Sequence, residues 1–163
     1  MRIIPEALEK LTEELRNLPG VGPRTPERYA YHILKSSEIE ASKLSSTIEK
    51  IHRSIGYCEK TFALVEKGKK LSDLYTDPER DKQQVVVVAE PFDIISIEKT
   101  RAFRGTYHVL GGLISPIDNI NPDDLKIQEL IVRIDEDKVK EIIFATSASV
   151  EGESTALYIQ KQL

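Results

Sequence analysis

The first third of the chain repeats apolar residues with the period of a helix. From residue 5 to residue 18, leucines at spacings of three and four form one apolar stripe opposite Glu and Lys: Leu8, Leu11, Leu15 and Leu18. The stripe stops at Pro19-Gly20. A second helix is predicted after Pro23, with Thr25 as its N-cap and Pro26 at its first position.

Two further apolar faces are expected in this part of the chain. Tyr29, Ile33 and Leu34 are predicted to form the buried face of the second helix. A third amphipathic helix is predicted from about residue 38 to about residue 55, with four side chains turned inward: Ile39, Leu44, Ile48 and Ile51. Residues 1–56 are therefore predicted to form an all-α domain.

The second half alternates strand-like and helix-like segments. The β-branched run from Val85 to Val88 has no polar alternation, which is typical of a parallel strand covered on both faces. Further strands are predicted at 107–110 and 141–146, and helices at 93–100, 125–134 and 151–163. This βαβαβα order predicts an α/β domain with a mostly parallel sheet over residues 81–163. Residues 57–80 are expected to be a small loop-rich connector.

The charge is distributed unevenly between these parts. The 163 residues carry a formal charge of −4, and residues 1–56, 57–80 and 81–163 contribute +1, 0 and −5. Any DNA contact must therefore be a local basic patch. A single cysteine excludes a disulfide framework. No segment has the length of a membrane span or the core of a signal peptide, so the expected location is the cytoplasm, without membrane association.

The turn between the first two helices is a candidate phosphate-binding element. In Leu-Pro-Gly-Val-Gly-Pro-Arg (18–24), Gly20 and Gly22 allow a tight turn whose N–H groups, with the start of the next helix, can face a phosphate. Arg24 and Arg28 lie four residues apart and can add charge-assisted bonds. An ordinary helical hairpin fits the spacing equally well. The segment with its flanking helices resembles a helix-hairpin-helix, a sequence-independent DNA-backbone module.

The end of the valine strand is a candidate acidic site. In Ala-Glu-Pro-Phe-Asp (89–93), Glu90 follows the strand directly and Asp93 comes three residues later. Both are expected at the carboxyl ends of the strands, where parallel sheets bind ligands. Glu90 resembles the glutamate of the Toprim fold, which acts beside an Asp-x-Asp pair that binds magnesium. Residues 145–149 lack that pair, so a two-metal site is hard to assemble. Glu151 and Glu153 could substitute, although acidic residues favour a helix start for structural reasons alone.

Taken together, the motifs resemble one family, the bacterial recombination mediator RecR. Tyr-His-Val-Leu-Gly-Gly (107–112) is very similar to a segment of that family, and the other blocks follow in its order: residues 18–34 for the helix-hairpin-helix, 76–81 for the end of the zinc module, 89–91 for the start of Toprim and 146–158 for the Val-Glu-Gly-Glu signature. Without the resemblance, His108 beside two glycines could contact a phosphate or carboxylate, but a histidine at a strand edge is commoner.

The chain departs from this family in two places. Family members carry Cys-x-x-Cys twice before Toprim; here Cys58 fits the first position, but Thr61, Ser72 and Tyr75 stand at the others. Because structural zinc needs about four N or S ligands, we expect a degenerate, metal-free finger stabilised by Ile55, Phe62 and Leu64. The chain also stops where the family continues with a strand and helix, so ring closure is in doubt.

The resemblance implies a non-enzymatic DNA repair protein. Such a protein binds single- and double-stranded DNA at the nucleoid without sequence preference, and works with RecO, in many bacteria also with RecF, to load recombinase at gaps. Gly20, Gly22, Arg24, Arg28 and Lys35 would face DNA phosphates. The acidic group Glu90, Asp93, Glu151 and Glu153 would face a basic partner. No cofactor is expected, although weak magnesium binding is compatible with these carboxylates.

The oligomeric state and the class of activity have alternatives. A homodimer or tetramer follows from the resemblance, and a weakly DNA-binding monomer or dimer fits the few basic residues. One rival function is a magnesium-dependent nuclease or primase-like enzyme using Glu90, Glu151 and Glu153. Another is a purely structural subunit whose hairpin serves dimerisation.

Overall fold

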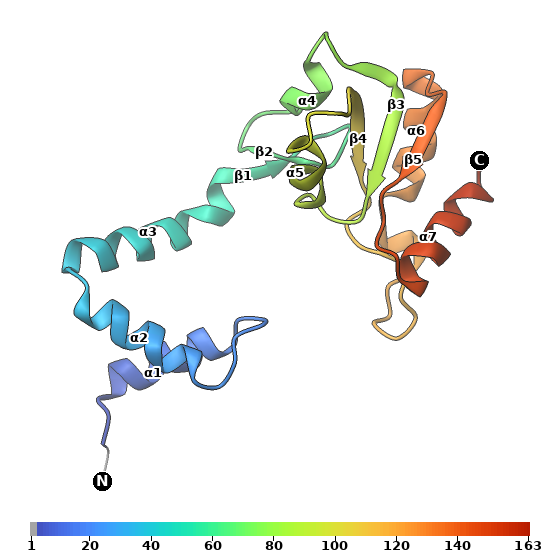
Figure 1. Ribbon diagram of the computed structural model, residues 1–163. Helices are drawn as coiled ribbons and strands as arrows, with labels where there is room; N and C mark the ends of the chain where they lie inside the picture. Colours follow the sequence, from blue (N-terminus) through green and yellow to red (C-terminus); the bar gives the residue numbers. More distant parts are fainter. Residues whose placement is uncertain (1–2) are drawn as a thin grey trace. The chain divides into compact units, whose positions relative to one another are not determined.

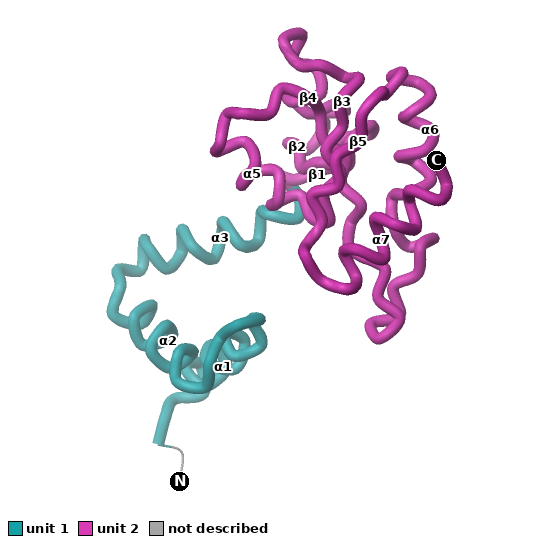
Figure 2. Tube along the Cα trace, turned by 45° about the vertical axis from the view of Figure 1, so that its right-hand side comes forward, with its two compact units in different colours: residues 1–53 teal, residues 54–163 magenta. Residues whose placement is uncertain are grey.

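The structure, a computed structural model, describes residues 3–163 as two compact units, residues 3–53 and residues 54–163 (Figures 1 and 2). The first unit is helical, and the second contains all the strands of the described residues. Over that same range, no helix has the length and apolar character needed to cross a membrane.

The first unit contains three helices: α1 (Glu6–Arg16), α2 (Thr25–Lys35) and α3 (Glu38–Ser54), whose last residue belongs to the second unit. α1 packs against α2, and the predicted leucine stripe is half-buried at Leu8, Leu11 and Leu15. The prediction of Thr25 as N-cap is wrong by one residue. Arg24 is the N-cap of α2, Pro26 is its second residue, and no side chain caps the helix.

Several apolar side chains expected to be buried in this unit are exposed. On α2, Tyr29 and Leu34 are exposed, Ile33 is half-buried, and the buried residues are Pro26 and Ala30. On α3 no residue is buried, and the four predicted to face inward are 47% to 81% exposed: Ile39, Leu44, Ile48 and Ile51. These burial predictions are wrong because periodicity identifies a face that needs an apolar partner, but not whether the chain itself supplies that partner.

The second unit is built on a parallel three-stranded sheet in the order β4-β3-β5. Its strands are β3 (Asp81–Val88), β4 (Gly105–Val109) and β5 (Glu141–Phe144). The connecting helices are α5 (Asp93–Glu98) and α6 (Ile127–Asp137), α6 being preceded by a 3₁₀ turn (Pro122–Asp124), and α7 (Val150–Gln160) follows β5. The predicted α/β domain with a parallel sheet is confirmed.

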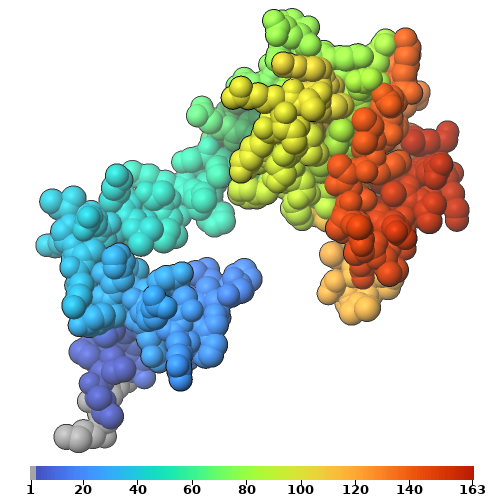
Figure 3. All heavy atoms as spheres, viewed as in Figure 1, coloured from blue at the N-terminus to red at the C-terminus, as the bar shows by residue number. Residues whose placement is uncertain are grey.

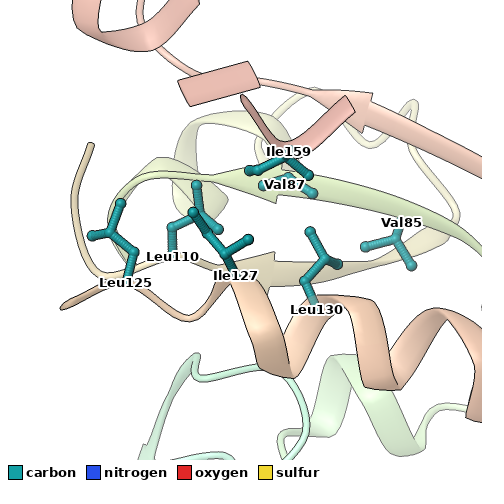
Figure 4. Packing of buried hydrophobic residues seen from close by; sticks show 7 residues of the cluster. All are labelled: Val85, Val87, Leu110, Leu125, Ile127, Leu130 and Ile159. Atoms are coloured by element: carbon teal, nitrogen blue, oxygen red, sulfur yellow. The ribbon is translucent and has the colours of Figure 1, made fainter. Parts of the chain in front are cut away.

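The valine run lies at the centre of this unit, with both faces covered. Val85 and Val87 contact a core that includes side chains of α6 and α7 (Figure 4): Leu110, Leu125, Ile127, Leu130 and Ile159. Val86 and Val88 contact a second core on the other face: Ala63, Ile94, Tyr107 and Val109. Because all four valines are at most 3% exposed, the two-sided burial predicted from the unbroken apolar run is confirmed.

The connector between the helical unit and the sheet is folded and belongs to the second unit. It contains the antiparallel strands β1 (Ile55–Tyr57) and β2 (Leu64–Glu66) and the short helix α4 (Asp73–Thr76). The backbone N–H of Val109 donates to the carbonyl oxygen of Thr61 (2.9 Å), so this segment borders β4. Phe62 packs against the core as expected, whereas Ile55 and Leu64, on the paired strands β1 and β2, are more than a third exposed.

Candidate functional site

The hairpin between α1 and α2 leaves the start of α2 open. The N–H of Val21 donates to the carbonyl of Leu18 (3.3 Å), and that of Thr25 to the carbonyl of Gly22 (3.1 Å). Gly20 has a φ of +76°, a conformation that favours glycine, whereas Gly22 has no positive φ. No side chain caps α2. Because the N–H of Thr25 is bonded to Gly22 and Pro26 has no N–H, the first-turn group that remains for an anion is the N–H of Glu27.

Three basic residues predicted for DNA contact lie on or beside α2 and are exposed. Arg24 is the N-cap of α2 and Arg28 lies in its first turns, and neither forms an ion pair with another residue of the range 3–163. Lys35 ends the helix, about 10 Å from Arg28 along the axis, and its Nζ lies 4.7 Å from the centre of the Tyr31 ring. The hairpin therefore presents an open helix start flanked by two guanidinium groups.

A hollow at the carboxyl ends of the strands contains part of the predicted acidic group. It has a volume of about 320 Å³ and is lined in part by Glu90, Glu151 and Asp118. Asp118 comes from the loop of residues 111–121, which protrudes from the surface of the second unit (Figure 3). Sequence reasoning missed Asp118 because it belongs to neither a strand end nor a recognised motif.

The other two predicted acidic residues do not line this hollow. The carboxylate of Asp93 accepts the backbone N–H of Glu90 (2.8 Å), and the N–H of Asp93 donates back to the carbonyl of Glu90 (3.1 Å), so Asp93 closes the turn before α5. Glu153 is exposed on α7, beyond the residues that line the hollow. The structure thus brings together only Glu90 and Glu151 of the four.

The loop before α7 replaces the missing Asp-x-Asp pair with hydroxyls. Ser149 is the N-cap of α7, and its Oγ accepts the N–H of Gly152 (3.2 Å) and lies 3.0 Å from the Oγ of Ser147. A Cβ on Gly152 would lie 2.0 Å from the carbonyl oxygen of Ser147. Glycine is therefore required here because the loop and α7 approach so closely.

These side chains do not form a metal-binding set. Among residues 3–163 no group of three or more His, Cys, Asp or Glu side chains is placed to hold a metal ion. Magnesium prefers several oxygen ligands in near-octahedral geometry, and the hydroxyls of Ser147 and Ser149 are engaged with each other or with backbone. The magnesium implied by the Toprim resemblance thus does not fit this donor set.

A second, larger hollow lies beside the first and shares Glu90 with it. Its volume is about 520 Å³, and its walls come from the finger and the strand ends: Tyr57, Phe62, Pro91, Val109, Leu110, Gly111, Asp124 and Lys126. The Lys126 ammonium lies 5.3 Å from the centre of the Phe62 ring. Together, the two hollows give this edge of the sheet an apolar floor with carboxylates around it.

The four positions that would hold zinc are all buried in the second unit. Cys58, Thr61, Ser72 and Tyr75 are 0%, 1%, 5% and 7% exposed. One thiol, two hydroxyls and a phenol do not match the thiolate and imidazole ligands that structural zinc needs. Family-typical zinc does not fit these residues.

A buried polar network connects the finger to the sheet and α6. Arg133 donates from Nη1 to the carbonyl of Tyr107 (2.6 Å), from Nη2 to Oγ1 of Thr106 (2.6 Å) and from Nε to Asp137 (2.9 Å). Asp137 also accepts the hydroxyl of Tyr75 (2.8 Å). Burial and this hydrogen bond raise the pKa of Tyr75 to about 12. The charges of Arg133 and Asp137 are thus paired, and their hydrogen bonds connect Tyr75 of the finger to the sheet.

His108 of β4 is fully buried, and its structural role agrees with the common interpretation of a histidine on a strand. Its Nε2 donates to the carbonyl of Lys126 (2.7 Å), while its Nδ1 has no partner among the described residues. Burial lowers the pKa of His108 to about 4, and the nearby Arg133 charge adds to that effect. The ring is therefore neutral at pH 7.

Comparison with known proteins finds a family match for the helical unit and another for the α/β unit. Residues 8–52 match the family model described as RecR, helix-hairpin-helix, and residues 83–163 match the Toprim domain model. The chain is 42% identical to Recombination protein RecR of Synechococcus elongatus over 163 residues, which is all of this chain and 81% of the relative.

Two further relatives extend the comparison. Recombination protein RecR of Moorella thermoacetica is 47% identical over 159 residues, 98% of this chain and 79% of the relative. That of Rippkaea orientalis is 46% identical over 156 residues, 96% of this chain and 78% of the relative. With this identity over nearly its whole length, the protein belongs to the RecR family of recombination proteins.

Proposed function

We propose that this protein is a non-catalytic recombination mediator that binds DNA through the α1–α2 hairpin and docks RecO, and in some settings RecF, so that recombinase is loaded onto single-stranded DNA at gaps. Membership of the RecR family gives the role in recombination and repair. The observation that carries the DNA-binding part is the uncapped, exposed start of α2 with Arg24 and Arg28 beside it.

The chemistry of the hairpin fits phosphate rather than base recognition. Backbone N–H groups and guanidinium groups contact phosphate oxygens without reading sequence. The α1–α2 hairpin offers both, together with Lys35 further along α2. Binding to single- and double-stranded DNA should therefore be independent of sequence and weaken with salt.

Fluorescence anisotropy with labelled oligonucleotides at several salt concentrations tests this assignment. Arg24→Ala with Arg28→Ala should weaken binding at least about ten-fold and reduce the salt slope by about 1.4 for single strands, since each lost phosphate contact contributes about 0.7. The control is Lys43→Ala with Lys50→Ala, which removes the same charge from exposed positions of α3. Equal effects of the two pairs, or none from the first, would contradict the hairpin assignment.

The acidic edge of the sheet is the proposed docking site for RecO. Glu90 and Glu151 line one hollow beside an apolar floor, an arrangement that suits a basic protein surface. Glu90→Gln with Glu151→Gln should weaken RecO binding in titration calorimetry. Glu153→Gln lies outside the hollow and is the matched control. If the control has the larger effect, this docking site is wrong.

The proposed homodimer uses the apolar face of α3. Leu44, Ile48 and Ile51, at helical spacings of four and three, are 47%, 62% and 48% exposed and form a row of apolar side chains that the first unit leaves uncovered. A second copy offers the same face, as a two-fold interface requires. In analytical ultracentrifugation, Ile48→Glu should shift the protein toward the monomer, whereas Ser42→Glu, on the opposite face, should not. An unchanged mass with Ile48→Glu would exclude this face.

A nuclease or primase-like activity is the rival function. Of the three carboxylates that it needs, Glu90 and Glu151 line one hollow, but Glu153 lies outside it. We expect no cleavage of DNA with magnesium or manganese. Cleavage that Glu90→Gln abolishes would replace the mediator proposal with an enzymatic one.

A further inference from the structure

The finger keeps the spacing of a zinc ribbon without its ligands. Cys58 and Thr61, like Ser72 and Tyr75, are separated by two residues, which is the spacing of paired zinc ligands. All four side chains are buried close to the hairpin of β1 and β2. A family member with zinc at these positions would have the metal as the main cross-link of this segment.

Direct polar contacts stand where the metal would be. The Oγ1 of Thr61 lies 3.4 Å from the Oγ of Ser72, and the backbone N–H of Ser72 donates to the Sγ of Cys58 (3.3 Å). The N–H of Cys58 donates to the carbonyl of Ala63 (2.8 Å), and the N–H of Phe62 to the carbonyl of Cys58 (3.0 Å). Residues from both halves of the finger are thus joined without a ligand.

The fourth position has a different partner. Tyr75 donates its hydroxyl to Asp137 on α6, and its ring lies 5.2 Å from the Arg133 guanidinium carbon. This contact connects the finger to the sheet through Arg133. A cysteine could not reach Asp137, so the residue that replaces the ligand adds a cross-link of its own.

The backbone nevertheless presents a donor to the sulfur of Cys58. The N–H of Ser72 donates to its Sγ (3.3 Å), and a hydrogen bond to sulfur of this kind also stabilises a thiolate. The thiolate is the form of cysteine that binds metal.

We infer that this finger folds without metal, held by the Cys58–Thr61–Ser72 contacts and the Tyr75–Asp137 bond, and that its backbone retains a latent tetrahedral zinc site that three thiols would restore. The inference concerns the stability of the second unit. It is independent of the proposed DNA binding, which uses residues of the first unit, whereas the proposed RecO site shares Tyr57 and Phe62 with the finger.

The unaltered full-length protein gives the first test. After growth with added zinc and extensive dialysis, elemental analysis should find no stoichiometric zinc, and EDTA should leave the thermal unfolding midpoint unchanged. About one zinc per chain, or a midpoint lowered by EDTA, would overturn the metal-free fold. DNA binding measured in parallel separates this result from the proposed function.

The full-length variant with Thr61→Cys, Ser72→Cys and Tyr75→Cys gives the second test. It should bind about one zinc per chain and, with Co²⁺, show the visible absorption of tetrahedral thiolate coordination. A variant that is unfolded alone and folds on adding zinc supports the latent site, because zinc ribbons couple metal binding to folding. Failure to bind either ion, folded or unfolded, would refute it. Tyr75→Phe, which adds no thiol, is the control and should bind no metal.

Discussion

The buried imidazole of His108 should make the stability of the second unit fall in mild acid. Its Nε2 donates to the Lys126 carbonyl, and Phe62 lies edge-on to the ring, with 5.5 Å between ring centres. A proton on Nδ1 would be buried without a partner within residues 3–163 and would add charge near Arg133. Protonation therefore favours the unfolded chain.

The size of the effect follows from the two pKa values. The pKa is about 4 when folded and 6.5 for an ordinary histidine. Because the unfolded state binds the proton more tightly, this contribution to stability is complete above pH 6.5 and is lost as the pH falls toward 4. Between pH 7 and pH 5 the loss is about 2 kcal/mol, and it approaches about 3 kcal/mol below pH 4.

Urea denaturation followed by circular dichroism at several pH values measures this loss. Carboxylates also titrate in the range, so the relevant quantity is the difference from His108→Gln, whose amide can still donate to the Lys126 carbonyl but cannot take up a proton. The original protein should lose about 2 kcal/mol more than this variant between pH 7 and pH 5. His32→Gln, at an exposed position of α2, is the control. Parallel pH profiles for the original protein and His108→Gln would refute the argument.

Two further predictions concern contacts of the second unit. Tyr75→Phe removes the hydroxyl bonded to Asp137 and should lower the free energy of unfolding by about 1 kcal/mol; an unchanged urea midpoint would mean that the bond contributes nothing. Gly152→Ala places a Cβ 2.0 Å from the carbonyl oxygen of Ser147 and should cost about 1–3 kcal/mol. Thermal unfolding of the alanine variant, with Ala148→Gly on the same loop as the comparison, would show whether the close approach is the cause.

The sheet could be predicted because each of its strands has a local signal. Val85 to Val88 form an unbroken β-branched run, and their burial on both faces follows from that pattern alone. The same kind of reasoning failed for Ile39 and Ile48, since α3 has no apolar layer against it within the described residues of its unit. Periodicity predicts where a helix has an apolar face, and packing decides whether that face is covered.

The candidate sites could be predicted only as far as local sequence positions them. Glu90 follows directly from its strand, and Glu151 from its helix, so their meeting at one hollow agrees with the expected edge. Asp93 could not be excluded from the site by spacing, because its bond to the backbone of Glu90 depends on the turn geometry. The cross-link between Tyr75 and Asp137 joins residues 62 positions apart, and neither residue belongs to a motif that would indicate the other.

The order of the strands in the sheet also determines when each part of the second unit can fold. In the central strand, Val86 pairs with Tyr107, 21 positions later, and with Ile143, 57 positions later. Closing the longer loop costs about 1 kcal/mol more in chain entropy, so pairing of β3 with β4 should precede docking of β5. On the ribosome, β3 and β4 leave the exit tunnel first. Until β5 and α7 follow, Val85 and Val87 lack the cover that Ile159 supplies, and the incomplete sheet exposes apolar surface that favours aggregation.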